Sequence, residues 1–96
     1  MDKLLENKNI LVTGASGGIG RITSKTLALY GANLILAGRN VANLTRTNEE
    51  IKKIGRNSVC IPTDITSRAE VNNLFATIDK TFGKLDGAFN NSGFIE

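Results

Sequence analysis

Short apolar runs alternate with longer amphipathic segments along the whole chain, and this alternation limits the folds that the chain can adopt. Four runs are continuously apolar, at residues 10–12, 34–37, 59–61 and 88–89. Strands that are buried on both faces of a sheet read in this way, without alternating apolar and polar side chains. The runs therefore predict four strands of a largely parallel sheet.

The three segments between the runs have the spacing of amphipathic helices. Their apolar sides are predicted to be Ile19, Ile22, Thr26, Leu27 and Tyr30 in the first, Val41, Leu44, Ile51 and Ile54 in the second, and Val71, Leu74, Phe75, Ile78 and Phe82 in the third. The segments stop at Gly31, Gly55 and Gly83, and glycine accepts a left-handed helix cap without steric cost. The third segment opens with Ser67-x-x-Glu70, the spacing of a capping box.

Strands that alternate with helices favour an α/β fold. The sequence predicts a doubly wound parallel sheet of the Rossmann type, with the first four strands only, in the order 3-2-1-4. The 96 residues fit a single domain. In this order the strand at residues 88–89 lies at an edge with no fifth strand beside it, so we expect the domain to be incomplete at its C-terminus.

The first strand is joined to the first helix by a glycine-rich turn, Thr13-Gly14-Ala15-Ser16-Gly17-Gly18-Ile19-Gly20. Backbone N–H groups and the positive end of a helix dipole stabilise a pyrophosphate, and side chains on the turn would keep it away. We expect Gly14 to make the tight turn, Gly18 to admit the pyrophosphate and Gly20 to let the helix pack closely on the strand. A plain turn needs one or two glycines, whereas this one has four in seven residues.

The spacing Gly-x-x-x-Gly-x-Gly after Thr13 resembles the cofactor motif of the short-chain dehydrogenase/reductase family. Two further motifs resemble those of the family: Asp64-Ile65 after the third strand, and Asn90-Asn91-Ser92-Gly93 after the fourth, with Ser92 in place of alanine. The resemblance covers residues 8–93. It implies that residues 1–96 form the dinucleotide-binding domain of an oxidoreductase that acts on carbonyl or alcohol groups.

The resemblance also implies a place for each motif against the dinucleotide. The backbone of Ser16, Gly17 and Ile19 would line the pyrophosphate, and Asp64-Ile65 would lie against the adenine ring. The residues themselves leave a second interpretation of Asp64 open, as a polar cap at the end of the strand where the next helix begins.

The asparagine motif has two open interpretations. Asn90 either ties the central strands together through side-chain hydrogen bonds or contacts the cofactor, and the resemblance supports both roles equally. For Asn91 a contact with the ribose is favoured, and Gly93 completes the motif.

The end of the second strand predicts which dinucleotide is bound. An acidic residue there favours NAD(H), whereas an arginine accommodates the 2′-phosphate of NADP(H). The sequence reads Leu36-Ala37-Gly38-Arg39-Asn40, without an acid. Arg39 can grip a phosphate with two parallel hydrogen bonds, unless it is merely solvated. We expect NADP(H) rather than NAD(H), with a moderate preference, because many relatives that prefer NADP(H) carry a second basic residue where this chain has Gly17.

The catalytic pair of the family, a tyrosine with a lysine four residues later, does not occur in the sequence. The only tyrosine is Tyr30, and Leu34 stands four residues after it. We therefore assign no catalytic residue and expect the family's serine, tyrosine and lysine beyond Glu96, in a longer protein of which this segment alone is inactive. The alternative is a stand-alone nucleotide-binding or sensor module without catalysis. The unprotected edge strand favours the first interpretation, and it predicts self-association or pairing with the other half.

Composition excludes several other classes of function. The net charge of +3 is scattered along the chain, which argues against binding to nucleic acid. With no histidine and one cysteine, a transition-metal site is not expected. Cys60 lies in an apolar run and is expected to pack as a small hydrophobic residue. The N-terminus is no signal peptide and no stretch is long and apolar enough for a membrane span, so a cytoplasmic protein is the default expectation.

Overall fold

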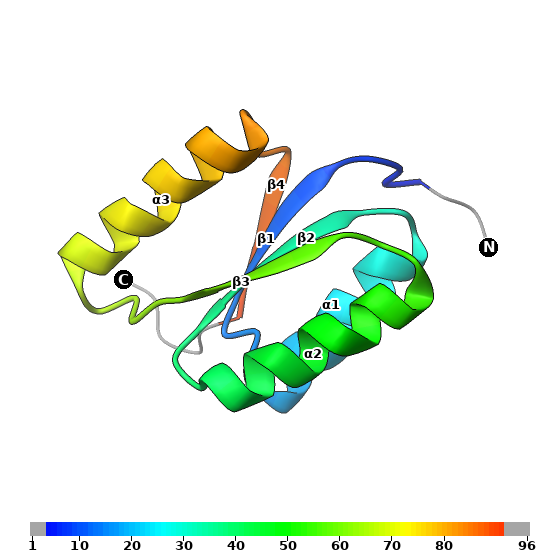
Figure 1. Cartoon of the computed structure of the whole chain (residues 1–96), viewed down its shortest axis with the longest axis horizontal. Coiled ribbons are helices and arrows are strands. Elements are labelled where there is room, and N and C mark those ends of the chain that lie inside the picture. The colour runs from blue at the N-terminus through cyan, green and yellow to red at the C-terminus, as the bar shows by residue number, and fades with distance from the viewer. Residues whose placement is uncertain (1–3, 92–96) are drawn as a thin grey trace.

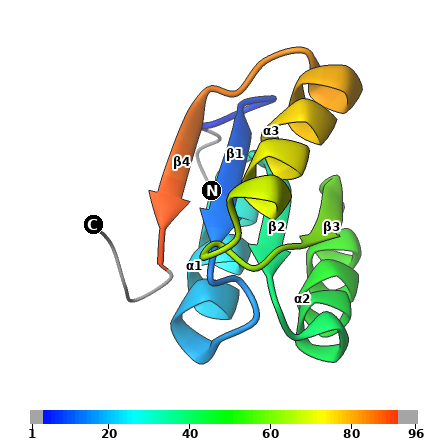
Figure 2. The same ribbon diagram turned by 90° about the vertical axis from the view of Figure 1, so that its left-hand side faces the viewer.

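The computed structural model describes residues 4–91 as four strands and three helices. In chain order these are β1 (Asn9–Thr13), α1 (Gly18–Leu29), β2 (Asn33–Gly38), α2 (Val41–Ile54), β3 (Ser58–Pro62), α3 (Arg68–Phe82) and β4 (Gly87–Asn90). All pairings are parallel and the order across the sheet is β3-β2-β1-β4, as Figure 2 shows with β3 and β4 at the two edges. The predicted fold class and strand order are confirmed.

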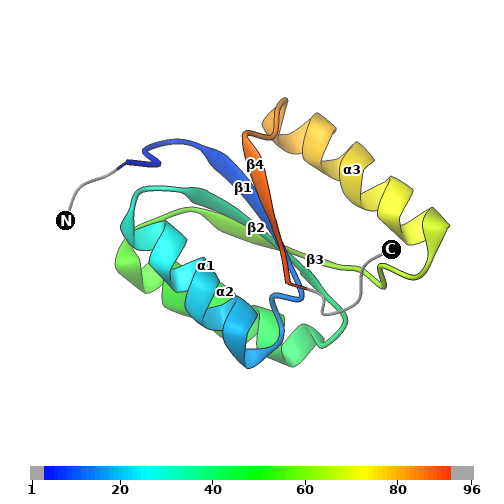
Figure 3. The same ribbon diagram turned by 180° about the vertical axis from the view of Figure 1, so that it is seen from behind.

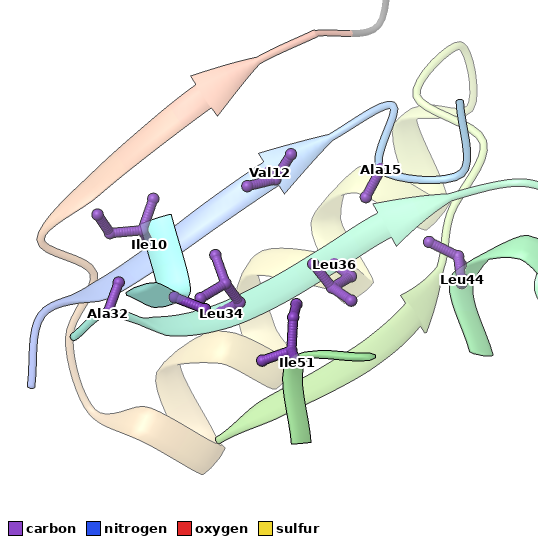
Figure 4. Close-up of a cluster of buried hydrophobic side chains, with 9 residues drawn as sticks. Ile10, Val12, Ala15, Ala32, Leu34, Leu36, Leu44 and Ile51 are labelled. Carbon is purple, nitrogen blue, oxygen red and sulfur yellow. The ribbon is translucent and has the colours of Figure 1, made fainter. Parts of the chain in front are cut away.

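The helices cover both faces of the sheet. In Figures 1 and 3, α1 and α2 lie together on one face and α3 lies on the other. On the first face, Ile10, Val12, Leu34 and Leu36 pack with Leu44 and Ile51 of α2 (Figure 4). Their strand neighbours Leu11, Ile35 and Ala37 point to the other face and pack with Leu74 and Ile78 of α3. Two buried faces explain why the strands are apolar without alternation.

The predicted apolar side of α1 is wrong for most of its members. Ile19 and Ile22 are 67% and 65% exposed, and the buried side consists of Gly20, Ser24 and Ala28. Thr26 is also exposed, Tyr30 is half-buried, and Leu27 packs against the core as predicted. A Cβ on Gly20 would lie 2.2 Å from the carbonyl oxygen of Gly14, so α1 lies too close to the glycine-rich turn at this point to bury a large side chain there.

The other two helices follow their predicted sides more closely. In α2, Leu44 and Ile51 are buried and Ile54 packs against them, but Val41 is exposed. In α3, Leu74 and Ile78 are buried, Phe82 packs beside them and Val71 is half-buried, whereas Phe75 is exposed. Both helices end at the predicted glycines, which adopt the left-handed conformation with φ of 96° at Gly55 and 81° at Gly83.

A charged contact joins the two helices that share a face. Arg21 of α1 donates two hydrogen bonds, of 2.8 and 2.7 Å, to the carboxylate of Glu50 in α2. This contact lowers the pKa of Glu50 to about 2, so its carboxylate stays ionised at neutral pH. The pair ties the start of α1, and with it the glycine-rich turn, to the neighbouring helix.

Cys60 is half-buried in β3 and packs against the core of the first face, as predicted. Its thiol donates to the carbonyl of Leu44 at 3.3 Å. No helix within residues 4–91 is long and apolar enough to cross a membrane.

Candidate cofactor-binding site

The carboxyl ends of β1, β2 and β3 meet at one side of the sheet, and a pocket of about 300 Å³ opens there. The chain leaves β1 and β2 for one face of the sheet and β3 for the other (Figure 1), and open α/β sheets bind ligands outside the carboxyl ends of their strands. The pocket is lined by Gly14, Ser16, Gly38, Arg39, Thr63, Asp64, Ile65 and Thr66. Five of the predicted site residues are thus brought together from three separate turns.

The glycine-rich turn is held by backbone hydrogen bonds. Gly14 has a φ of 64°, a left-handed conformation that favours glycine. Its carbonyl accepts a hydrogen bond of 3.2 Å from the amide of Gly17, and the amide of Ala15 donates to the carbonyl of Ala37 at 3.0 Å. The turn is therefore tight and is fastened to the end of β2.

Two glycines at the start of α1 differ in the space around them. A Cβ on Gly20 would lie 2.2 Å from the carbonyl oxygen of Gly14 and 2.8 Å from the Cα of Ala15. A Cβ on Gly18 would meet no heavy atom within 4 Å. Gly20 is needed by the folded chain itself, whereas the space at Gly18 is open to a ligand.

The N-terminus of α1 is suited to an anion. Its N-cap residue, Gly17, has no side chain that could accept a hydrogen bond from the first turn, and that turn contains no acidic residue. The N-caps of α2 and α3 differ, since Asn40 and Ser67 each accept a hydrogen bond from a helix amide. A helix end without a cap leaves its N–H groups and dipole available to a phosphate.

Arg39 and Asp64 line the pocket at the ends of β2 and β3. The Arg39 side chain is 75% exposed, and its Nη1 lies 3.7 Å from Oδ2 of Asp64. The Oδ1 atom of Asp64 accepts hydrogen bonds from the amide (2.9 Å) and the hydroxyl (2.6 Å) of Thr66. These bonds, with a smaller contribution from Arg39, hold the pKa of Asp64 below its ordinary value. The contacts with Thr66 are those of the strand-end cap that the sequence left open for this residue.

The capping box at the start of α3 is formed in one direction only. The Ser67 hydroxyl accepts from the amide of Glu70 at 3.2 Å, as its spacing predicts. The Glu70 carboxylate, however, accepts from the amide of Asp64 at 2.8 Å instead of that of Ser67. Glu70 thereby supports the loop that carries Asp64.

The asparagine motif links β4 to β1. The Thr13 hydroxyl donates to Oδ1 of Asn90 at 2.8 Å, and the amide of Asn91 donates to the Thr13 hydroxyl at 3.1 Å. The strand-tying role of Asn90 is thus seen in the structure, and neither asparagine lines the pocket described above. Gly93 lies outside the described residues.

Three lining residues were not predicted from the sequence: Gly38, Thr63 and Thr66. A Cβ on Gly38 would lie 2.9 Å from the Ser16 hydroxyl, so this glycine makes room for the turn after β1. The Thr63 amide donates to the Gly38 carbonyl at 2.8 Å and fastens the ends of β2 and β3 together. Gly38 could have been predicted, because a glycine at the end of a strand often marks a place where another part of the chain approaches closely.

Among residues 4–91, no group of three or more histidine, cysteine, aspartate or glutamate side chains is arranged to hold a metal ion.

Comparison with known proteins agrees with this geometry. The family model described as short chain dehydrogenase matches residues 8–96. The chain belongs to the short-chain dehydrogenase/reductase family. An uncharacterised oxidoreductase of Listeria monocytogenes is 37% identical over 91 residues, which are 95% of this chain and 37% of that protein. The 3-hydroxyacyl-CoA dehydrogenase type-2 of Drosophila melanogaster is 37% identical over 94% of this chain and 34% of its own length.

Solved structures of the family have the same fold. The NAD+-bound xylitol dehydrogenase superimposes with a TM-score of 0.92 at 33% identity, over 96% of this chain and 35% of that one. The L-sorbose reductase of Gluconobacter frateurii, complexed with NADPH and L-sorbose, gives 0.90 at 27% identity, over all of this chain and 37% of that one. The chain therefore spans about a third of the length of these relatives.

Proposed function

We propose that this part of the protein binds NADP(H), in preference to NAD(H), for a short-chain dehydrogenase/reductase that acts on carbonyl or alcohol groups. The observation that carries the proposal is Arg39, an exposed guanidinium on the rim of a pocket in a turn without an acid. The family as such does not decide between the cofactors, since relatives are described with NAD+ and with NADPH. The proposal therefore depends on the residues of this chain.

The remaining site residues support the same ligand. The open space at Gly18 and the uncapped start of α1 suit the pyrophosphate, which the backbone of Ser16, Gly17 and Ile19 would approach. Asp64 and Ile65 lie in the pocket beside Arg39, where the adenine end would be placed. Asn91 is proposed to contact the ribose. A bound nicotinamide would supply hydride transfer, and the residues named here would hold the adenine and pyrophosphate part of the dinucleotide.

Arg39→Ala is expected to weaken NADPH binding by about ten- to hundredfold, since one charge-assisted hydrogen-bond contact is worth about 1.5–3 kcal/mol. NADH binding should change little, because NADH lacks the 2′-phosphate. Calorimetric titration of both cofactors measures the effect. Lys80→Ala is the matched control, since it removes one cation from the last turn of α3. Equal affinity of the wild-type protein for NADPH and NADH would contradict the assignment.

We also propose that residues 1–96 supply cofactor binding without the acid/base group of the reaction. The only tyrosine, Tyr30, is half-buried at the end of α1, and Leu34, four residues later, is buried in β2. The stand-alone binding module is the alternative. A Tyr-x-x-x-Lys motif within the coding sequence downstream of Glu96 would support the oxidoreductase, and its absence would favour the module.

The 96-residue chain on its own is expected not to oxidise NADPH with carbonyl compounds, because a positioned acid/base group contributes ~10²–10⁴-fold in rate. It should also self-associate, or pair with the remaining part of the protein. The described part of the sheet ends at β4, where Phe89 is 41% exposed. An edge strand can pair with another chain through its backbone groups, and the exposed Phe89 adds apolar surface to this one. Light scattering with an NADPH-oxidation assay tests both expectations, and a monomer with turnover would refute them.

A further inference from the structure

The ion pair between Arg39 and Asp64 spans the rim of the pocket. Arg39 follows β2 and Asp64 follows β3, and the hydrogen bond from the Thr63 amide to the Gly38 carbonyl holds these two strand ends together. Both residues line the pocket. A 2′-phosphate that is bound by Arg39 would therefore lie next to the carboxylate of Asp64.

The Asp64 carboxylate is held in place on this rim. Its Oδ1 accepts two hydrogen bonds from Thr66, and its own amide donates to Glu70. The second oxygen, Oδ2, is the atom that faces Arg39. The hydrogen bonds from Thr66 hold the pKa of Asp64 below the ordinary value of an aspartate, so its carboxylate is ionised at neutral pH. Arg39, in contrast, is largely exposed, so its guanidinium can change partners.

We infer that Asp64 is a specificity-determining residue that weakens the preference for NADP(H), because its carboxylate competes with the 2′-phosphate for the guanidinium of Arg39. The inference rests on the proposed function, in which Arg39 binds that phosphate. Two anions then share one cation, and the dinucleotide must displace Asp64 from Arg39 or accept a like charge beside its phosphate. A ligand without a 2′-phosphate leaves the ion pair intact and bears no such cost.

The inference is tested with two ligands that differ only in the 2′-phosphate, 2′,5′-ADP and 5′-AMP. Asp64→Asn keeps an oxygen that can accept the hydrogen bonds of Thr66 and removes the charge. The affinity for 2′,5′-ADP relative to 5′-AMP should rise roughly two- to fivefold, the size of effect expected from one exposed ion pair. The gain should be smaller in an Arg39→Ala background. A contact of Asp64 with adenine would alter both affinities alike and cancels in this ratio.

Glu70→Gln is the matched control. Glu70 carries the same charge in the same region, next to Arg39 and Asp64, but its carboxylate accepts from the Asp64 amide. Competition for Arg39 predicts a gain for Asp64→Asn that clearly exceeds that of Glu70→Gln. Equal gains in the two variants, an equal gain with and without Arg39, or no gain would overturn the inference. If the wild type does not distinguish the two ligands and Arg39→Ala changes neither affinity, the proposed function itself fails.

Discussion

Gly18→Val is expected to abolish dinucleotide binding while the free energy of unfolding stays close to that of the wild type. A side chain can be added at this position of the free protein, because a Cβ on Gly18 meets no heavy atom within 4 Å. Gly18 is also the first residue of α1 and does not have a positive φ, so a larger residue introduces no backbone strain. The same space is the one that the proposed pyrophosphate needs. Fluorescence titration with NADPH and denaturant unfolding measure the two quantities separately.

Gly87→Val is the matched control for this variant. A Cβ on Gly87 likewise meets no atom within 4 Å, and the residue begins β4, whereas the pocket lies at the carboxyl ends of the strands. Its stability and its affinity for NADPH should both be retained. Normal NADPH binding by Gly18→Val would show that the pyrophosphate does not lie at the glycine-rich turn.

The strand order and the faces of the sheet could be predicted because they depend on properties that each residue displays in the sequence. The runs that became β1 and β2 are apolar at every position, and the structure buries Leu11 and Val12 on opposite faces. The buried side of α1 could not be found in this way. It is made of small residues, of which Gly20 and Ser24 have no apolar side chain to mark it.

The candidate site likewise has features that the sequence displays and features that only the folded chain shows. The turn after β1 is recognisable because four of the seven residues from 14 to 20 are glycine, and Arg39 is recognisable because it directly follows an apolar run. The approach of Gly38 to Ser16 and of Asp64 to Arg39 depends on how far each strand extends before it turns. Asp64 and Arg39 are 25 positions apart, and no spacing rule connects side chains on two separate strand ends. Their competition for one ligand follows only from the folded chain.

Gly20 is required by the packing of the turn, whereas Gly18 is proposed to make room for the ligand. Gly20→Ala should lower the free energy of unfolding by about 2–4 kcal/mol. The added methyl group would clash with the backbone of Gly14 and Ala15, which cannot move aside as a flexible side chain could. The added Cβ would lie 2.2 Å from the Gly14 carbonyl oxygen, and both atoms that it meets next, the Ala15 Cα and the Gly14 carbonyl carbon, are also backbone. In a domain of this size such a loss is a large part of the total stability.

Gly18→Ala, two residues earlier on the same helix, is the control for Gly20→Ala. It adds the same methyl group in open space, and alanine is favoured over glycine in helices by up to about 1 kcal/mol, so its stability should be unchanged or slightly higher. Denaturant unfolding of the two variants and the wild type gives the comparison. Equal stabilities of Gly18→Ala and Gly20→Ala would mean that α1 can shift away from the turn. The close packing of this helix on the end of β1 would then not be what requires Gly20.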